Sequence, residues 1–138
     1  MISRTTKYAL NVLRFLARDP DRRTPTDRLA QATGVPANYL SKILSQLRKH
    51  DVVEGEKGWR GGFQLRPSAL DRTIRSIDEI FDKRPKRSTS RECIFGLAPC
   101  DSANPCALHE RWEHVRTERD AMFTTITVRD LLRAEGRR

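Results

Sequence analysis

The chain of 138 residues is basic and rich in charge, with 33% charged residues, 37% hydrophobic residues and a net charge of +9. This length fits one compact domain with an extension. No apolar run approaches the ~20 residues of a membrane-spanning helix, which excludes a membrane protein. Residues 1–72 hold 14 Lys and Arg against 7 Asp and Glu, an imbalance that suits a polyanionic partner, most often nucleic acid. No apolar export signal opens the chain, so we expect a cytoplasmic protein.

Two helices are predicted in the first 34 residues. Residues 4–18 place their apolar side chains at helical spacing, and Asp19-Pro20 ends that helix. Thr24 is expected to cap a second, short helix whose first residue is Pro25. Gly34 should end the second helix as a left-handed C-cap.

A third helix is predicted from Pro36 to about His50, with a buried stripe of four apolar residues. Two short helices joined by a tight turn, the second polar and basic on its outer face, are typical of a helix–turn–helix. Helical hairpins without a DNA function share this pattern, so the segments that follow decide the interpretation. The outer face, which we predict to contact DNA, consists of Asn38, Tyr39, Ser41, Lys42, Ser45, Gln46, Arg48 and Lys49.

A β-hairpin is predicted directly after this helix, with strands at 52–54 and 63–65 around a glycine-rich turn. An ordinary hairpin would need no basic tip, whereas a hairpin in this position with basic residues favours the wing of a DNA-binding domain. Lys57, Trp59, Arg60 and Gly61 are expected to contact the DNA backbone or the minor groove.

Further helices are predicted in the second half of the chain. Thr73 can cap a fourth helix, and the polar, basic residues 83–92 suggest a linker. Asn104-Pro105 is a helix start signal, so a long helix should run from Pro105 to about Thr124. Thr127 and Asp130 should cap a last short helix. The apolar positions of the long helix approximate a heptad seam, which favours pairing with a second copy over packing on its own domain. These dimerisation residues are Leu108, Trp112, Val115, Met122 and Phe123.

Three cysteines lie within 14 residues, and the rest of the chain has none. An odd number excludes complete disulfide pairing. Cys93, Cys100 and Cys106, with His109 three residues further on, are candidate metal ligands. If the long helix starts at Pro105, Cys106 and His109 share one face of it. Their spacing matches neither the zinc-finger nor the ferredoxin pattern, so an iron–sulfur cluster, a zinc ion and reactive thiols remain comparable interpretations. Alternative oxygen donors for a fourth position are Glu92, Asp101 and Glu110.

Taken together, these segments resemble the Rrf-two family of bacterial winged-helix regulators, of IscR and NsrR type. The resemblance rests on residues 7–10, 35–49, 57–65 and 126–131 and on the three-cysteine segment. It implies a homodimer that binds a pseudo-palindromic operator in double-stranded DNA, with an iron–sulfur cluster on Cys93, Cys100 and Cys106.

The resemblance also bears on the type of cluster. His109 resembles the fourth ligand of the IscR-like branch, whereas the position of an acidic ligand in the NsrR-like branch holds Lys7. This favours [2Fe–2S] over [4Fe–4S]. Ser41 stands where the IscR pattern has an acidic residue, and the first gap between cysteines is one residue longer, so the operator need not be that of IscR.

The sequence therefore predicts a mainly α fold with a small β-hairpin, in three parts. Residues 1–82 form a winged helix–turn–helix domain, 83–104 a linker and cluster loop, and 105–138 the dimerisation and closing helices. The predicted function is a homodimeric transcription regulator, a repressor, whose cluster senses redox state, nitric oxide or iron status. The alternative is a cluster-free thiol sensor of the same fold. A basic electron-transfer protein fits less well, and no enzymatic site or small-molecule substrate is indicated.

Overall fold

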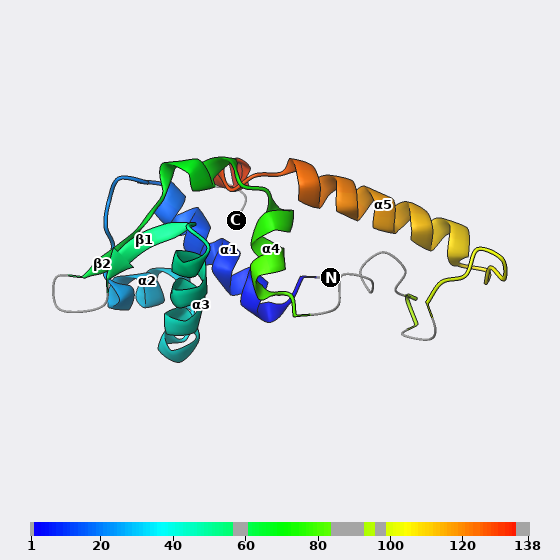
Figure 1. The fold of residues 1–138 in the computed structure, drawn as a ribbon, viewed down its shortest axis with the longest axis horizontal. Helices are drawn as coiled ribbons and strands as arrows, with labels where there is room; N and C mark the ends of the chain where they lie inside the picture. The colour runs from blue at the N-terminus through cyan, green and yellow to red at the C-terminus, as the bar shows by residue number, and fades with distance from the viewer. Residues whose placement is uncertain (1, 57–60, 84–92, 96–98, 135–138) are drawn as a thin grey trace. The chain divides into compact units, whose positions relative to one another are not determined.

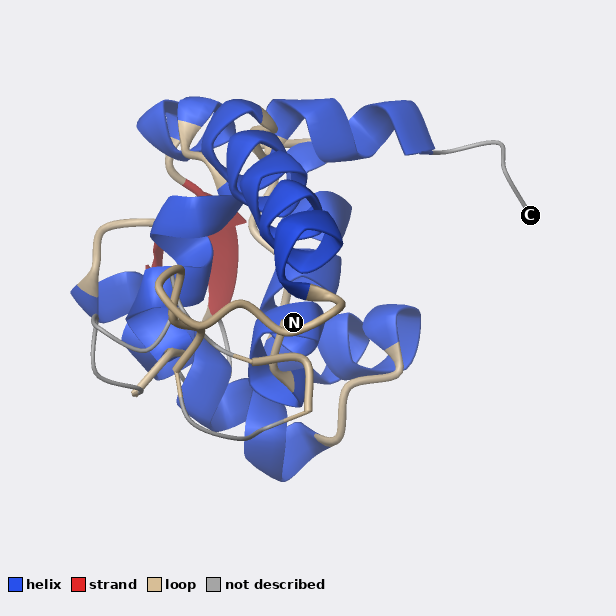
Figure 2. Ribbon diagram, turned by 90° about the vertical axis from the view of Figure 1, so that its right-hand side faces the viewer, coloured by secondary structure: helices blue, strands red, loops and turns tan. Residues whose placement is uncertain are grey.

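The computed structural model describes residues 2–56, 61–83, 93–95 and 99–134. Within these residues the fold is mainly helical, with one antiparallel hairpin, as the sequence predicts. Figure 1 shows the elements in chain order, and Figure 2 shows how small the sheet is beside the helices. The elements are α1 (Arg4–Ala17), α2 (Thr26–Thr33), α3 (Ala37–Lys49), β1 (Val53–Glu56), β2 (Gly62–Leu65), η1 (Pro67–Asp71), α4 (Ile74–Phe81), α5 (His109–Thr125) and η2 (Arg129–Ala134).

The chain divides into two compact units, and each is considered by itself. One unit comprises residues 1–82 together with 124–138, and the other comprises residues 83–123. The closing segment therefore packs with the first 82 residues. Compactness does not test which segment carries which function, so the threefold functional division stays a prediction.

Helix α1 is the centre of the first unit and contacts α2, α3, α4 and η2. Its apolar stripe, which includes Val12 and Leu13 at 0% exposure, faces the other helices. Complete burial of one such side chain contributes about 1.5–3 kcal/mol. The hydroxyl of Thr6 donates to Asp78 Oδ1 at 2.8 Å and joins α1 to α4 through a buried polar contact. Because a buried carboxylate needs such a partner, this bond also fixes how the two helices meet.

Most of the predicted helix ends are confirmed. Gly34 ends α2 with a φ of 69°, in the left-handed region that glycine tolerates. Thr73 caps α4, and its side chain accepts a hydrogen bond from the backbone of Ser76. At the last short helix, the Thr127 hydroxyl accepts a hydrogen bond from the backbone N–H of Asp130, and the Asp130 carboxylate accepts one from the backbone N–H of Thr127. These ends depend on local chemistry, which the sequence displays directly.

The predicted cap of α2 is wrong. Thr24 does not cap the helix, which begins at Thr26 with Pro25 in the N-cap position and without a side-chain cap. Thr24 is instead buried and pairs with Phe63 through two backbone hydrogen bonds of 2.9 and 2.8 Å. This bridge adds a third chain segment to the edge of the hairpin. A long-range backbone pairing has therefore replaced the local capping bond.

The predicted start of the long helix is also wrong. Helix α5 begins at His109 rather than Pro105. The Asp101 side chain accepts from the backbone of Ala103 and from the side-chain amide of Asn104, at 2.9 and 3.0 Å. An aspartate that bonds the backbone two residues ahead makes a turn of its own. The Asn104-Pro105 signal is thus used within a turn, four residues before regular helix begins.

Candidate nucleic-acid interface and cysteine segment

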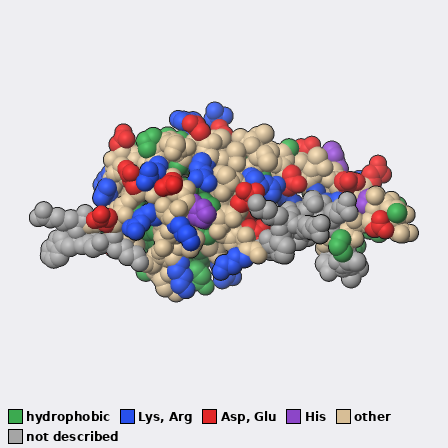
Figure 3. Space-filling view, viewed as in Figure 1, with side chains coloured by type: hydrophobic (Ala, Val, Ile, Leu, Met, Phe, Trp, Pro, Cys, Tyr) green, Lys and Arg blue, Asp and Glu red, His purple; other side chains and the backbone are tan. Residues whose placement is uncertain are grey.

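Helix α3 has one buried face and one polar face, as its sequence predicts. Leu40, Ile43, Leu44 and Leu47 are at most 1% exposed. Of the predicted contact residues, Ser41 is half-buried and the other seven are exposed. Lys and Arg side chains lie over and beside this helix in the space-filling view (Figure 3). The elements before and after α3 therefore leave a polar, basic face accessible.

The ring of Tyr39, on this polar face, packs against the ring of Tyr8. Its ring centroid lies 5.9 Å from that of Tyr8 in α1, at an interplanar angle of 63°. Edge-to-face pairs of this kind are favourable. Tyr39 remains 42% exposed, so the pairing restricts its ring without covering it. Tyr8 is not among the residues predicted to contact DNA, although it lies within residues 7–10, one of the segments on which the family resemblance rests.

The C-terminal end of α3 is built as a Schellman motif, in which the last carbonyls are satisfied by the residues just beyond the helix. The Val52 amide donates to the carbonyl of Leu47 at 2.9 Å, and the Asp51 amide donates to that of Arg48 at 3.1 Å. Asp51 takes the left-handed position with a φ of 58°, where glycine is usual. The carbonyl of His50 accepts from the guanidinium of Arg72 at 2.9 Å.

The hairpin follows directly from this helix end. β1 pairs with β2 from Val53 opposite Leu65 to Glu56 opposite Gly62. The guanidinium of Arg48 donates to the carbonyl of Gly55 at 3.2 Å, so it connects α3 to β1. The predicted phosphate contact of Arg48 stays a prediction beside this structural role. Gly61 is half-buried and directly precedes β2, while Lys57, Trp59 and Arg60 lie outside the described residues.

The cysteine segment presents three free thiols. Cys93 and Cys100 are half-exposed, and Cys106 is exposed. The Cys93 sulfur accepts a hydrogen bond from the backbone N–H of Phe95 at 3.4 Å. Within the part of the chain that the structure describes, no three His, Cys, Asp or Glu side chains are gathered as a metal site would require. The structure therefore provides the donor types without bringing them together.

Cys106 lies outside the helix, which corrects the expectation that it shares a helical face with His109. The Cys106 carbonyl accepts from the His109 amide at 3.0 Å, so the two residues are joined by a turn that leads into α5. The His109 side chain is 12% exposed, and its Nε2 lies 3.7 Å from Oε2 of Glu113, one helical turn further on. The i,i+4 spacing of His109 and Glu113 is the sequence signal that indicates this pair.

The predicted dimerisation residues divide into two groups. Leu108, Val115 and Met122 recur every seven residues and are 38%, 53% and 49% exposed. Trp112 between them is half-buried, whereas Phe123 is only 5% exposed within a single chain. Leu108 lies in the turn just before α5, which corrects its predicted place on the long helix. A seven-residue apolar repeat that remains exposed is the pattern of a coiled-coil seam.

Among the described helices, none is long and apolar enough to cross a membrane.

Comparison with known proteins identifies the class of this fold. The sequence model of the Rrf2 family, described as "Iron-dependent Transcriptional regulator", matches residues 2–134. An HTH-type transcriptional regulator of Aquifex aeolicus is 32% identical over 137 residues, which cover 98% of this chain and 93% of that protein. The regulator IscR of Photobacterium profundum is 26% identical and is matched over 92% of this chain and 72% of its own length.

Solved structures share the fold at lower identity. CymR, the global cysteine regulator of B. subtilis, superposes with a TM-score of 0.72 at 23% identity and covers 96% of both chains. IscR of T. potens superposes with a TM-score of 0.70 at 20% identity, over 99% of this chain and 89% of its own. These neighbours confirm the predicted winged-helix fold. The chain therefore belongs to the Rrf2 family of DNA-binding transcriptional regulators, a non-enzymatic class.

Proposed function

We propose that this protein is a homodimeric regulator that binds a pseudo-palindromic operator and whose affinity is controlled by an iron–sulfur cluster. The observation that carries the proposal is the exposed polar face of α3 beside a hairpin, in a chain of the Rrf2 family. Such helices enter the major groove of double-stranded DNA while the hairpin contacts the backbone or the minor groove. A repressor acts by occupying its operator, and we expect repression here.

The DNA-reading residues are proposed to lie at the exposed positions of α3. Lys42, Ser45 and Gln46 can reach base edges or phosphates, and Asn38 lies near the N-terminal end of the helix, where such helices meet DNA. Substitution of Lys42 by Ala should lower operator affinity about tenfold and reduce the slope of log K against log salt, since one cationic contact is lost. The matched control is Lys7→Ala, which removes an exposed cation from α1. Equal affinity and slope in both variants would contradict this assignment of the DNA face.

The second copy is proposed to pack along α5. Leu108, Val115 and Met122 form the exposed repeat, and Trp112 lies between them on the heptad pattern. Two-fold symmetric dimers bind two operator half-sites, which explains why a pseudo-palindrome is expected. Phe123 is already buried within its own chain, so it should contribute less to dimerisation than the exposed residues.

The cluster is proposed to be held by Cys93, Cys100 and Cys106, with His109 as fourth ligand. Three thiolates and one imidazole suit [2Fe–2S], which we favour over [4Fe–4S]. The description of the family as iron-dependent supports an iron cofactor. The hydrogen bond from the Phe95 backbone N–H to the Cys93 sulfur supports the assignment, because hydrogen bonds to the sulfur ligands tune the reduction potential of a cluster. Ligand binding and local folding are coupled in sites of this kind, so we expect the cluster to draw the sulfur atoms together.

The alternative is a cluster-free thiol switch, and the exposure of the cysteines favours it. All three thiols are free, and Cys106 is exposed, so reversible oxidation to a disulfide or a sulfenic acid is chemically accessible. An oxidised form of a structural neighbour, CymR of Staphylococcus aureus, has been solved. Under this alternative the protein would be colourless, and its DNA affinity would respond to peroxide and thiol.

Anaerobic purification followed by iron and acid-labile sulfide assays separates the two possibilities. We expect iron and sulfide in equal amounts and a visible absorption band, both lost in Cys100→Ser. The matched control is Ser102→Ala, an exposed position two residues away. A metal-free wild-type protein that binds DNA would contradict the cluster and support the thiol switch, and zinc alone would make the site structural.

A further inference from the structure

The closing segment after α5 is paired to the backbone just before α4. Thr127 forms an antiparallel bridge with Thr73. The Ile74 amide donates to the carbonyl of Ile126, and the Val128 amide donates to that of Arg72, both at 2.9 Å. Val128 itself is fully buried. These bonds fix residues 126–128 to the first unit as a short strand-like latch.

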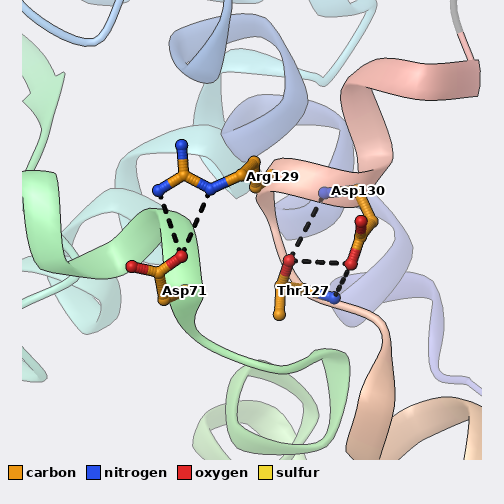
Figure 4. A network of polar contacts seen from close by, with 4 residues as sticks. All are labelled: Asp71, Thr127, Arg129 and Asp130. Carbon is orange, nitrogen blue, oxygen red and sulfur yellow. Dashed lines mark hydrogen bonds and ion pairs between the residues drawn. The ribbon is translucent and has the colours of Figure 1, made fainter.

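Side chains reinforce the latch at both of its ends (Figure 4). The Arg129 guanidinium donates through Nε and Nη2 to Oδ1 of Asp71, at 3.2 and 3.0 Å. The hydroxyl and the amide of Thr127 both donate to Oδ2 of Asp130, at 2.9 and 3.0 Å. Asp71 immediately precedes Arg72, so the ion pair and the backbone bond hold the same short stretch of chain.

The side chain of Arg72 extends from this stretch to the end of α3. Its Nη1 donates to the His50 carbonyl at 2.9 Å, across 22 residues of sequence. Its Nε lies 3.5 Å from the hydroxyl of Ser76, which in turn donates to the carbonyl of Thr73 at 2.8 Å. The Schellman motif satisfies the carbonyls of Leu47 and Arg48 but not that of His50. A cation at this end also meets the negative pole of the helix dipole.

We propose that Arg72 is a positioning residue for DNA binding. It caps the C-terminal end of α3, and the closing segment holds Arg72 in place. The inference rests on the proposed function of α3 as the DNA-reading helix. Since α5 ends at Thr125 and the latch begins at Ile126, the end of α5 is joined directly to the latch. The hydrogen bonds of Val128 with Arg72 and of Arg72 with His50 continue from the latch to the end of α3. Arg72 acts through α3 and makes no contact with DNA in this account.

The first experiment compares Arg72→Ala with Arg72→Lys, and with Arg22→Ala as a control that removes an exposed cation elsewhere in the unit. The DNA probe is a duplex selected by the wild-type protein from a randomised pool. We expect Arg72→Ala to weaken binding about three- to tenfold, the effect of one lost charged hydrogen bond passed on in part. The slope of log K against log salt should not change, because no phosphate contact is removed. Arg72→Lys, which retains a donor and the charge, should recover part of the affinity.

Backbone amide exchange supplies a readout that needs no DNA. We expect the amides of residues 50–52 to exchange faster in Arg72→Ala. A smaller increase is expected in Arg129→Ala, which removes the ion pair with Asp71 that reinforces the latch and does not touch α3. The double variant should add little to Arg72→Ala, because both changes act on one path. Arg129 is exposed, so its substitution should leave the fold intact.

The outcomes separate the claims. A salt slope reduced by about one in Arg72→Ala would make this residue a phosphate contact and overturn the positioning role. Unchanged exchange at residues 50–52 in Arg72→Ala would overturn it as well. Unchanged exchange in Arg129→Ala alone would overturn the part played by the ion pair between Arg129 and Asp71. If no duplex binds the wild-type protein while the exchange changes occur as expected, the proposed function fails and the hold of Arg72 on α3 stands.

Discussion

Replacement of Gly55 by Ala should disrupt the hairpin, because the residue has no space for a side chain. Gly55 in β1 has a φ of 154°, and a Cβ there would collide with the backbone carbonyl of Gly62 in β2. A backbone carbonyl in a paired strand cannot move aside as a flexible side chain can. The strands must therefore separate at this position, which also displaces the Gly55 carbonyl that accepts from Arg48.

The magnitude follows from two contributions. Forcing a non-glycine residue to a positive φ costs about 1–2 kcal/mol. Loss of two or three hydrogen bonds of the hairpin adds about 1 kcal/mol each. We therefore expect Gly55→Ala to lower the free energy of unfolding by about 3–5 kcal/mol, against a total of about 5–15 kcal/mol for a typical domain. Because the hairpin is the proposed wing, DNA affinity should fall about tenfold or more at temperatures where the variant is folded.

Gly34→Ala is the matched control for this change. Gly34 also has a positive φ, of 69°, but a Cβ there would meet no atom within 4 Å. It should cost only the conformational term of about 1–2 kcal/mol and leave DNA affinity unchanged. Urea denaturation and fluorescence anisotropy with a labelled duplex measure the two quantities. Equal stability and equal affinity of the two variants would refute the argument that the hairpin depends on the close approach of Gly55 and Gly62.

Three further predictions concern the described residues. Asp51→Val should lower the free energy of unfolding by about 1–2 kcal/mol in urea denaturation, because a β-branched residue is strained at a φ of 58°. Asp51→Gly should not lower it, and equal losses in the two variants would contradict the Schellman motif at the end of α3. Hydrogen bonds from Thr127 hold the pKa of Asp130 below its ordinary value of 3.8. The stability that Asp130 contributes is therefore complete above that value and lost as pH falls through the lower pKa of the folded state; the stability advantage over Asp130→Asn should disappear in acid, and a difference independent of pH would contradict it. Val115→Glu should convert the proposed dimer to a monomer in sedimentation equilibrium, while Thr117→Glu, at an exposed position on the face of α5 away from the seam, should not; a monomeric wild-type protein would remove the basis of this prediction.

The sequence predicted those parts of the fold that depend on local patterns. The buried stripe of α3 follows from apolar residues at helical spacing, and Leu40 and Leu47 are fully buried as expected. Gly34 and Thr73 mark helix ends because their effect is confined to one turn. The hairpin was visible from glycines between two alternating strands.

Contacts between distant segments could not be predicted in this way. Thr24 has the appearance of an N-cap, and only the folded chain brings Phe63 beside it as a backbone partner. The bond from Arg72 to the His50 carbonyl likewise depends on how η1 returns to the end of α3. A single basic residue among 27 gives no sign of such a role.

The cysteine segment shows another limit of sequence patterns. The presence of Cys93, Cys100, Cys106 and His109 identifies a set of donors, but their spacing outside a regular helical repeat does not define a geometry. The Asn104 side chain donates to Asp101 within a turn and does not cap a helix, so Cys106 lies before α5 and not on it. The assignment of these four residues as ligands therefore stays a prediction that rests on their donor atoms and not on their positions.

The most direct test of the account compares the DNA affinity of one anaerobic preparation before and after removal of its cluster by a chelator. Both forms are titrated with the same selected duplex, with Cys100→Ser as the form that cannot be loaded. The account predicts a change of about ten- to hundredfold in affinity on cluster loss, and the same affinity for apo wild type and Cys100→Ser. Equal affinity of the loaded and apo forms would contradict control by a cluster at Cys93, Cys100 and Cys106.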